Sequence, residues 1–194
     1  MQIAPDFEGA KWKALKLDDA ASLDWNVAIS VLDRRIRERY IAPADFLVAA
    51  EKTTPALERR FGFAILAIDC LLVETLGAFI AGLENTRGRS EEIFCQFLTS
   101  RSQFRDNFSQ SLAGQFYDEF RCGLLHQAEV RGNGKVWSVG PLIQKVGDNV
   151  IVNRNAFHEH LNSEFAAYLQ ELRDPSNTQL RSNFRKKMNF IARA

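Results

Sequence analysis

The chain has 194 residues, of which 46% are hydrophobic and 25% are charged, and its formal net charge is +1 at pH 7. This composition is ordinary for a globular protein, and the length suffices for one domain with a substantial core. A net charge near zero provides no whole-molecule field that would attract nucleic acid or a membrane surface. Any contact with nucleic acid must therefore use a local basic patch.

The cysteines and the N-terminus bear on the cellular compartment. Three cysteines, Cys70, Cys95 and Cys122, stand in apolar surroundings without CxxC spacing. This pattern favours buried free thiols in a reducing compartment over disulfides or a metal site. The first residues, MQIAPDFEGAKWK, lack the charged and then apolar pattern of a signal peptide. We therefore expect a cytoplasmic protein that uses no metal and no other cofactor.

The first 50 residues predict helices after an irregular start. Residues 1–20 show no periodicity, whereas 23–40 and 43–52 are both helical in character. Pro43 suits the first turn of the second helix, so we expect a break before it. We interpret residues 1–50 as an N-terminal helical extension within a single domain of residues 1–194.

A long apolar helix is predicted over residues 57–84. Its segment FGFAILAIDCLLVETLGAFIAGL, residues 61–83, is long enough to span a bilayer. Asp69 and Glu74 lie near its middle, where each carboxylate would cost several kcal/mol or so in lipid. No second apolar span follows. We therefore expect the buried central helix of a protein without a membrane partner.

Further helices and a change of period follow. Helices are predicted over 91–107, from Ser109 or Ser111 to about 130, and over 155–173. Between the last two, KVWSV, LIQKV and NVIVN are short and β-branched, and GDN is a hairpin turn signal. The fold class is thus mainly α, a helical bundle over 55–175 with a small β-hairpin or meander insert at 135–153.

The C-terminal segment 176–194 reads as a basic tail without acidic residues. A tail of this kind either contacts RNA phosphates or is simply a solvated end, and the sequence leaves both open. The candidate RNA-binding residues are Arg181, Arg185, Lys186 and Lys187.

The stretch DEFRCGLLHQAEV, residues 118–130, carries the candidate site. On a helical wheel of about 100° per residue, Phe116, Phe120 and Leu124 share one face that packs inward. Arg121 and His126 fall about 140° apart on the other side, so we expect them to flank a polar stripe without contacting each other.

Arg121 and His126, in R121-C-G-L-L-H126 on the last long helix of a helical domain, resemble the HEPN family, whose signature is Arg, four to six residues, then His. The resemblance covers residues 57–173 and implies a four- or five-helix bundle that dimerises. Members that are enzymes are metal-independent endoribonucleases whose cleft combines the motifs of two protomers. The resemblance does not extend to residues 1–50 or to the β-insert.

The residue chemistry fits such a cleft in part. Histidine exchanges protons near neutral pH, and arginine offers a fixed charge and a planar fork for phosphate. Supporting residues would be Asp69 or Glu74, one of which could pair with Arg121, together with Asp118. Cys122 stands where active members often carry asparagine, and a thiol is a poor hydrogen-bond donor. A purely structural ion pair is the alternative role of the two carboxylates.

These observations leave three alternative functions open. The first is a HEPN-type endoribonuclease of the toxin or defence kind, which would cut RNA at a homodimer interface through Arg121 and His126 and could have a cognate antitoxin. The second is a HEPN-like binding or scaffold domain with little or no activity. The third is an unrelated helical interaction protein whose polar stripe is merely solvated.

Overall fold

The computed structural model describes residues 1–193, apart from the side chain of Ala56, and it is mainly helical as predicted. The α-helices in chain order are α1 (Gly9–Lys13), α2 (Asp24–Ile36), α3 (Ala42–Ala50), α4 (Gly62–Ala81), α5 (Ser90–Ser100), α6 (Gln110–Phe116), α7 (Gly123–Gln127), α8 (Arg154–Arg173) and α9 (Thr178–Ile191). Two π-helical segments, η1 (Arg37–Ile41) and η3 (Tyr117–Cys122), and a short 3₁₀ segment, η2 (Ala56–Glu58), join some of them.

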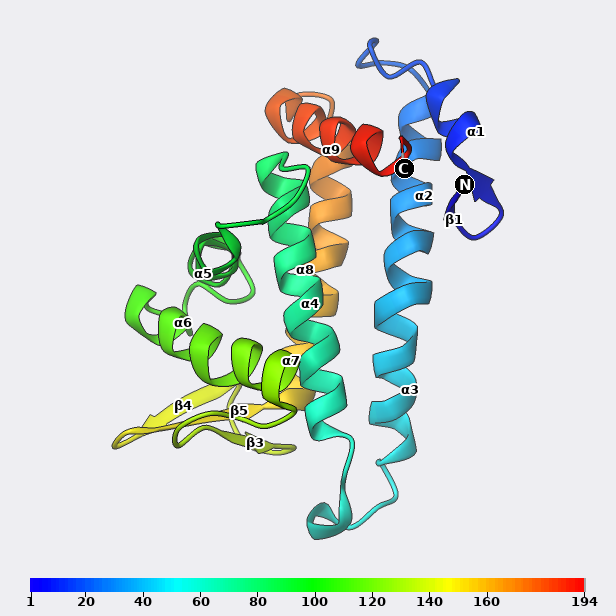
Figure 1. The fold of residues 1–194 in the computed structure, drawn as a ribbon. Helices are drawn as coiled ribbons and strands as arrows, with labels where there is room; N and C mark the ends of the chain where they lie inside the picture. Colours follow the sequence, from blue (N-terminus) through cyan, green and yellow to red (C-terminus); the bar gives the residue numbers. More distant parts are fainter. Residues whose placement is uncertain (194) are drawn as a thin grey trace.

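Helix α4 runs through the centre of the molecule (Figure 1). The α2–α3 rod lies along one side of it, α5 and the α6–α7 rod along the other, and α9 crosses one end of the bundle. The predicted break before Pro43 is wrong, because η1 continues α2 directly into α3 and Pro43 lies in the first turn of α3. Because proline has no N–H, it removes one hydrogen bond from the continuous rod, and the π-helical segment η1 lies directly before it.

One hydrophobic cluster forms the core and reaches from Ile3 to Ala192, so the first 50 residues share the core of the bundle. Its densest part is aromatic: the ring centroid of Phe116 lies 4.7 Å from that of Phe120 and 5.3 Å from that of Phe157. Such ring pairs contribute somewhat more than their buried area alone. The predicted inward face of Phe116, Phe120 and Leu124 is confirmed, since all three are buried.

Two small sheets complete the fold. Strands β1 (Gln2–Ala4) and β2 (Phe7–Glu8) pair antiparallel at the N-terminus, where irregular structure was expected. In the insert, β4 (Ile143–Val146) and β5 (Asn149–Asn153) form the predicted hairpin. Strand β3 (Lys135–Trp137) pairs parallel with β5, so the order is β3-β5-β4 and the insert is not a meander.

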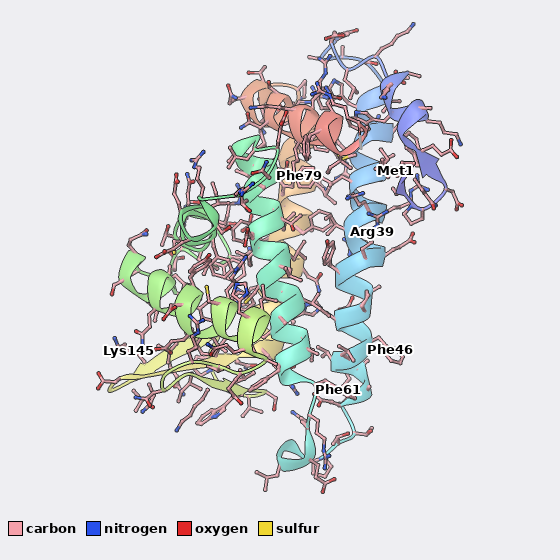
Figure 2. All side chains as sticks on the ribbon, viewed as in Figure 1. Met1, Arg39, Phe46, Phe61, Phe79 and Lys145 are labelled. Atoms are coloured by element: carbon pink, nitrogen blue, oxygen red, sulfur yellow. The ribbon has the colours of Figure 1, made fainter. Side chains whose placement is uncertain are left out.

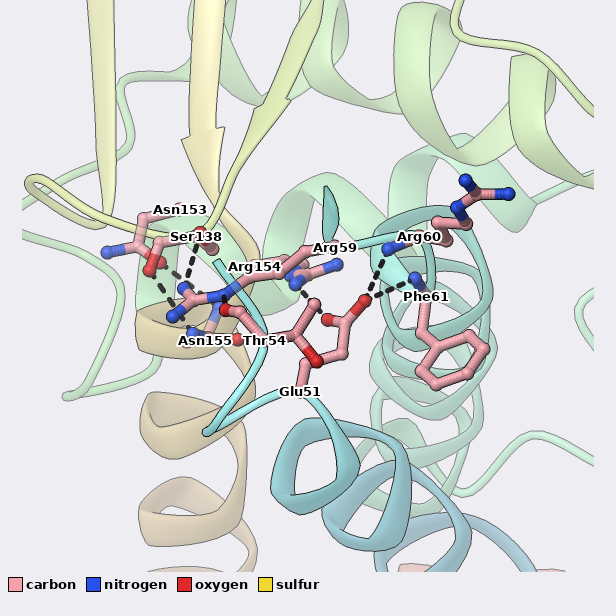
Figure 3. A network of polar contacts seen from close by, with 9 residues as sticks. All are labelled: Glu51, Thr54, Arg59, Arg60, Phe61, Ser138, Asn153, Arg154 and Asn155. Atoms are coloured by element: carbon pink, nitrogen blue, oxygen red, sulfur yellow. Dashed lines mark hydrogen bonds and ion pairs between the residues drawn. The ribbon is translucent and has the colours of Figure 1, made fainter. Parts of the chain in front are cut away.

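A buried ion pair fixes the start of α4 (Figure 3). The Glu51 carboxylate, at the end of α3, accepts hydrogen bonds from the backbone N–H groups of Arg60 and Phe61 and pairs with Arg154 at the start of α8. The first turn of α4 contains no acidic residue of its own. Glu51 therefore supplies the negative charge that a helix N-terminus favours. The end of α3 and the starts of α4 and α8 meet at this one carboxylate, and α8 is distant from the other two in sequence.

Helix α4 is a buried core helix, as predicted. By length and composition it could cross a membrane, but 61% of its most apolar 18-residue stretch is buried inside the protein. Phe79 lies among the helices near one end of α4, whereas Phe46 projects outward from α3 (Figure 2).

The prediction of a basic tail over 176–194 is wrong for most of that segment. Residues 178–191 form α9, whose Arg181, Phe184 and Met188 are buried. The ring of Phe184 packs edge-on against Trp12 at a centroid distance of 5.8 Å. The sequence hides this because the apolar residues that pack inward, Leu180, Phe184, Met188 and Ile191, are outnumbered by basic and polar ones along the helix.

Candidate functional site

Arg121 and His126 lie on the rod formed by α6, η3 and α7. The rod begins where predicted, because the Ser109 hydroxyl accepts a hydrogen bond from the backbone N–H of Leu112 at 3.2 Å. Over Tyr117–Cys122 it winds as a π-helix. Its i→i+5 hydrogen bonding brings residues five apart toward one side, whereas an α-helix separates them.

The two motif residues contact each other across the junction of η3 and α7. Arg121 Nη1 lies 3.3 Å from His126 Nε2. The wheel-based expectation that they flank a stripe without touching is therefore wrong, since Arg121 lies in the π-helical η3 and His126 in the α-helical α7, and one uniform wheel does not describe both. Segments of this kind occur often at functional sites.

Glu74 of α4 holds the arginine in place. Its Oε2 accepts hydrogen bonds from Arg121 Nη2 at 2.7 Å and Nε at 3.1 Å, and its Oε1 accepts one from the Thr86 hydroxyl. Burial opposes the charge on both partners. Even so, the hydrogen bonds from Thr86 and Arg121 lower the pKa of Glu74, and Glu74 raises the pKa of Arg121. Both side chains are ionised and fixed at neutral pH.

The site lies at the surface, but its Arg121–Glu74 ion pair is mostly shielded from solvent. The Arg121 and Glu74 side chains are 14% and 13% exposed, and the Tyr117 ring centroid lies 5.3 Å from the Arg121 guanidinium. His126 is exposed. The imidazole of His126 is thus accessible to a ligand, whereas most of the Arg121 side chain is shielded from solvent.

A hollow of about 280 Å³ opens beside Arg121. Lys187 of α9 reaches it and donates a hydrogen bond to the Glu84 carbonyl oxygen at 2.7 Å. Burial lowers the pKa of Lys187. The residues that line the hollow are Leu71, Glu74, Thr75, Ala78, Glu84, Asn85, Thr86, Arg121 and Lys187. One of the four basic residues predicted from the C-terminal segment therefore stands next to the motif arginine.

Asp69 is not part of this cluster. On α4 it lies five residues before Glu74 and faces the opposite side, where its Oδ1 is 2.8 Å from His158 Nδ1. His158 Nε2 in turn lies 3.0 Å from Asp45 Oδ1. Burial raises the pKa of Asp69 despite the neighbouring imidazole. Of the two carboxylates considered as partners of Arg121, the structure selects Glu74 and gives Asp69 a structural partner.

Asp118 lies apart from the motif pair, whereas Cys122 lies within interaction distance of Arg121 and Tyr117. Asp118 is exposed and forms an ion pair with Arg131 at 3.0 Å. Cys122 is half-buried, and all three cysteines are free. Burial raises the pKa of the Cys70 thiol, and that of Cys95 to about 11, which leaves both inert as nucleophiles.

The other basic residues of the C-terminal segment mostly serve the fold. Arg181 is buried and its guanidinium stacks on Trp25, 3.8 Å from the ring centroid. Arg185 forms an ion pair with Asp18 at 2.6 Å. Only Lys186 is exposed. Apart from Lys187, the four candidate RNA-binding residues therefore do not gather at the Arg121 hollow.

Sequence reasoning missed Thr86, Asn85 and Tyr117, which surround the ion pair. Their signal in the sequence is weak, because Asn85 and Thr86 look like ordinary polar residues of the segment NTRGRS that follows α4. Within residues 1–193, no group of three or more His, Cys, Asp or Glu side chains is arranged to hold a metal ion.

Comparison with known proteins does not place the chain in a family. No family model matches it, and neither a curated protein nor a solved structure gives a significant match. The functional argument therefore rests on the geometry around Arg121 and His126 and on the spacing of that motif.

Proposed function

We propose that this protein is a HEPN-like, metal-independent endoribonuclease that acts as a homodimer through the face carrying Arg121 and His126. The observation that supports this most is the 3.3 Å contact between the two side chains, with Arg121 oriented by Glu74. A cytoplasmic toxin or defence role, with a cognate antitoxin as partner, belongs to the same proposal.

The chemistry follows from the two residue types. In RNA cleavage the 2′-oxygen bonds to the adjacent phosphorus, the bond from phosphorus to the 5′-oxygen breaks, and a 2′,3′-cyclic phosphate and a 5′-hydroxyl result. A neutral imidazole takes the proton of the 2′-hydroxyl, and a protonated one gives a proton to the leaving oxygen. Arg121 stabilises the charge on the phosphate oxygens. One protomer has a single His126, and a dimer would supply two, one for each proton transfer.

An exposed apolar side of α4 supports the dimer. Leu71 and Phe63 are 41% and 39% exposed. Leu71 also lines the hollow beside Arg121. An exposed apolar side chain beside a polar site, such as Leu71, is compatible with a surface that another chain covers. A second copy on this side would bring its own Arg121 and His126 near the first pair.

Cleavage of a single-stranded RNA in EDTA tests the proposal. Wild-type protein is expected to release 2′,3′-cyclic ends, and His126→Ala to reduce the rate by at least about a hundredfold, the usual contribution of an acid–base residue. Gln127→Ala changes the neighbouring exposed residue and is the matched control. Equal rates for wild type and His126→Ala, with the fold intact by circular dichroism, would contradict the catalytic assignment.

The dimer is tested separately. Leu71→Glu places a charge on the apolar side of α4 and is expected to shift the mass in sedimentation from two chains to one, with loss of cleavage. A Leu71→Glu protein that stays dimeric and active would show that the dimer, if present, uses another face.

A second candidate, a HEPN-like binding domain without activity, has one observation in its favour. The guanidinium of Arg121 already makes two hydrogen bonds to Glu74 and is largely shielded from solvent. This reading predicts RNA binding that weakens in Lys187→Gln, but no cleavage by the wild type.

A further inference from the structure

A second hollow, of about 200 Å³, lies between α9 and the loop before α2. The residues that line it are Leu17, Asp18, Ala20, Trp25, Pro175, Thr178, Arg181, Ser182 and Arg185. None of them lines the hollow beside Arg121, so the two sites are separate.

Arg181 is the unusual member of this lining. Its side chain belongs to a residue only 5% exposed, yet no carboxylate among residues 1–193 forms an ion pair with it. A guanidinium has five N–H donors. Nη1 donates to the Ala20 carbonyl oxygen at 2.9 Å, and the buried Nε has no partner. Burial lowers its pKa, as expected for a desolvated cation.

A buried charge of this kind normally has a counter-ion. Burying a cation without one costs far more than burying an apolar group, so buried charges are generally paired. Stacking on Trp25 at 3.8 Å offsets part of that cost. A positive site that remains unpaired beside an open hollow is suited to an anion that enters from solvent.

The rest of the lining fits one kind of anion. Arg185 supplies a second guanidinium, which is now paired with Asp18, whose side chain is 87% exposed and free to move aside. Thr178 and Ser182 supply hydroxyl groups, and Thr178 begins the 14-residue helix α9, whose N-terminus favours negative charge. Leu17 and Pro175 supply the apolar wall of the same hollow.

We propose that this hollow binds a small phosphomonoester, with its phosphate on Arg181 and Arg185 and its carbon body against Leu17 and Pro175. Arginine forks bind phosphate through paired, charge-assisted hydrogen bonds. The volume of the hollow suits a molecule with one phosphate and a small ring, and it is too small for a folded nucleic acid. The proposal does not depend on ribonuclease activity.

Isothermal titration with phenyl phosphate and with inorganic phosphate tests this assignment. Wild-type protein is expected to bind both with 1:1 stoichiometry, and phenyl phosphate several-fold more tightly because its ring meets the apolar wall. Arg181→Gln is expected to weaken binding by at least about tenfold, the effect of losing a charge-assisted hydrogen bond. Arg105→Gln, which changes an exposed arginine outside the hollow, is the matched control.

A second variant tests the hollow while Arg181 is kept, in case Arg181→Gln fails to fold. Ser182 is exposed and lines the hollow, so Ser182→Phe is expected to block binding while Arg181 stays in place. The absence of saturable phenyl phosphate binding to the wild type would overturn the proposal, and so would wild-type affinity in both Ser182→Phe and Arg181→Gln. Equal affinity for the two phosphates would overturn the role given to the apolar wall.

Discussion

Replacing His158 with glutamine tests how much the buried Asp69–His158 pair contributes to stability. Asp69 is fully buried, His158 is 3% exposed, and Asp69 Oδ2 has no hydrogen-bond partner. Removing the imidazolium leaves a carboxylate in the core without its cation, and breaking a buried pair in this way costs about 3–5 kcal/mol. Because the glutamine amide can still donate to Asp69, we expect about 3 kcal/mol, or a fall in Tm of about 6–12 °C.

Urea unfolding followed by circular dichroism measures this loss. His160→Gln is the matched control, since His160 lies two residues away on α8 and its Nδ1 contacts only the Gln103 carbonyl oxygen, at 2.8 Å. That change should cost about 1 kcal/mol, the contribution of one neutral hydrogen bond. A loss in His158→Gln no larger than in the control would refute the view that the Asp69–His158 pair acts as a buried ion pair.

The same pair predicts a direction of pH dependence. Burial opposes the imidazolium, but the hydrogen bonds and charges of Asp69 and Asp45 outweigh burial and raise the pKa of His158. The folded state therefore keeps this proton to higher pH than the unfolded chain. The stabilisation is complete below the ordinary histidine pKa of about 6.5 and is lost as pH rises through the raised value. Wild-type stability should fall over this window, and His158→Gln should remove most of that fall.

Two further substitutions test the packing around the site and the start of α4. A Cβ on Gly123 would lie 2.4 Å from a backbone oxygen of the following turn, so Gly123→Ala should destabilise by about 1–3 kcal/mol. Gly114 has no neighbour within 4 Å, and Gly114→Ala should instead stabilise by up to about 1 kcal/mol; a fall in Tm for both variants would contradict this reasoning. Glu51→Gln leaves the buried Arg154 without its anion and should cost about 3–5 kcal/mol, whereas Glu58→Gln at the surface should leave urea unfolding within about 0.5 kcal/mol of wild type.

The regular features of the fold were predictable from residue patterns. The apolar run of α4 indicated a core helix, the turn GDN indicated the β4–β5 hairpin, and Ser109 indicated where the site helix begins. The inward face of Phe116 and Phe120 also followed from helical spacing. These features depend on local backbone preferences and on which face of an element is apolar, and both are written in a short stretch of sequence.

The arrangement of the site was decided by tertiary structure. The sequence offered Asp69 and Glu74 as equal partners for Arg121, and only the packing of α8 on one side of α4 and of η3 on the other assigned each carboxylate its cation. The sequence motif marked Arg121 and His126, but no residue pattern indicated the π-helical segment η3 or the contact between the two side chains.

Tertiary structure also decided which charged residues are buried at the start of α4 and in α9. Glu51 and Arg154 are 103 residues apart in sequence, and neither has a local signal that it will be buried. Arg181 reads as part of a solvated basic segment, yet it lies under the loop before α2. Burial of a charged residue requires contacts from another element, a carboxylate for Arg154 and a carbonyl oxygen with an aromatic ring for Arg181, so its position depends on distant segments. Sequence alone therefore determined the core helix, the β4–β5 hairpin and the motif of this protein, and the tertiary structure determined which charges meet.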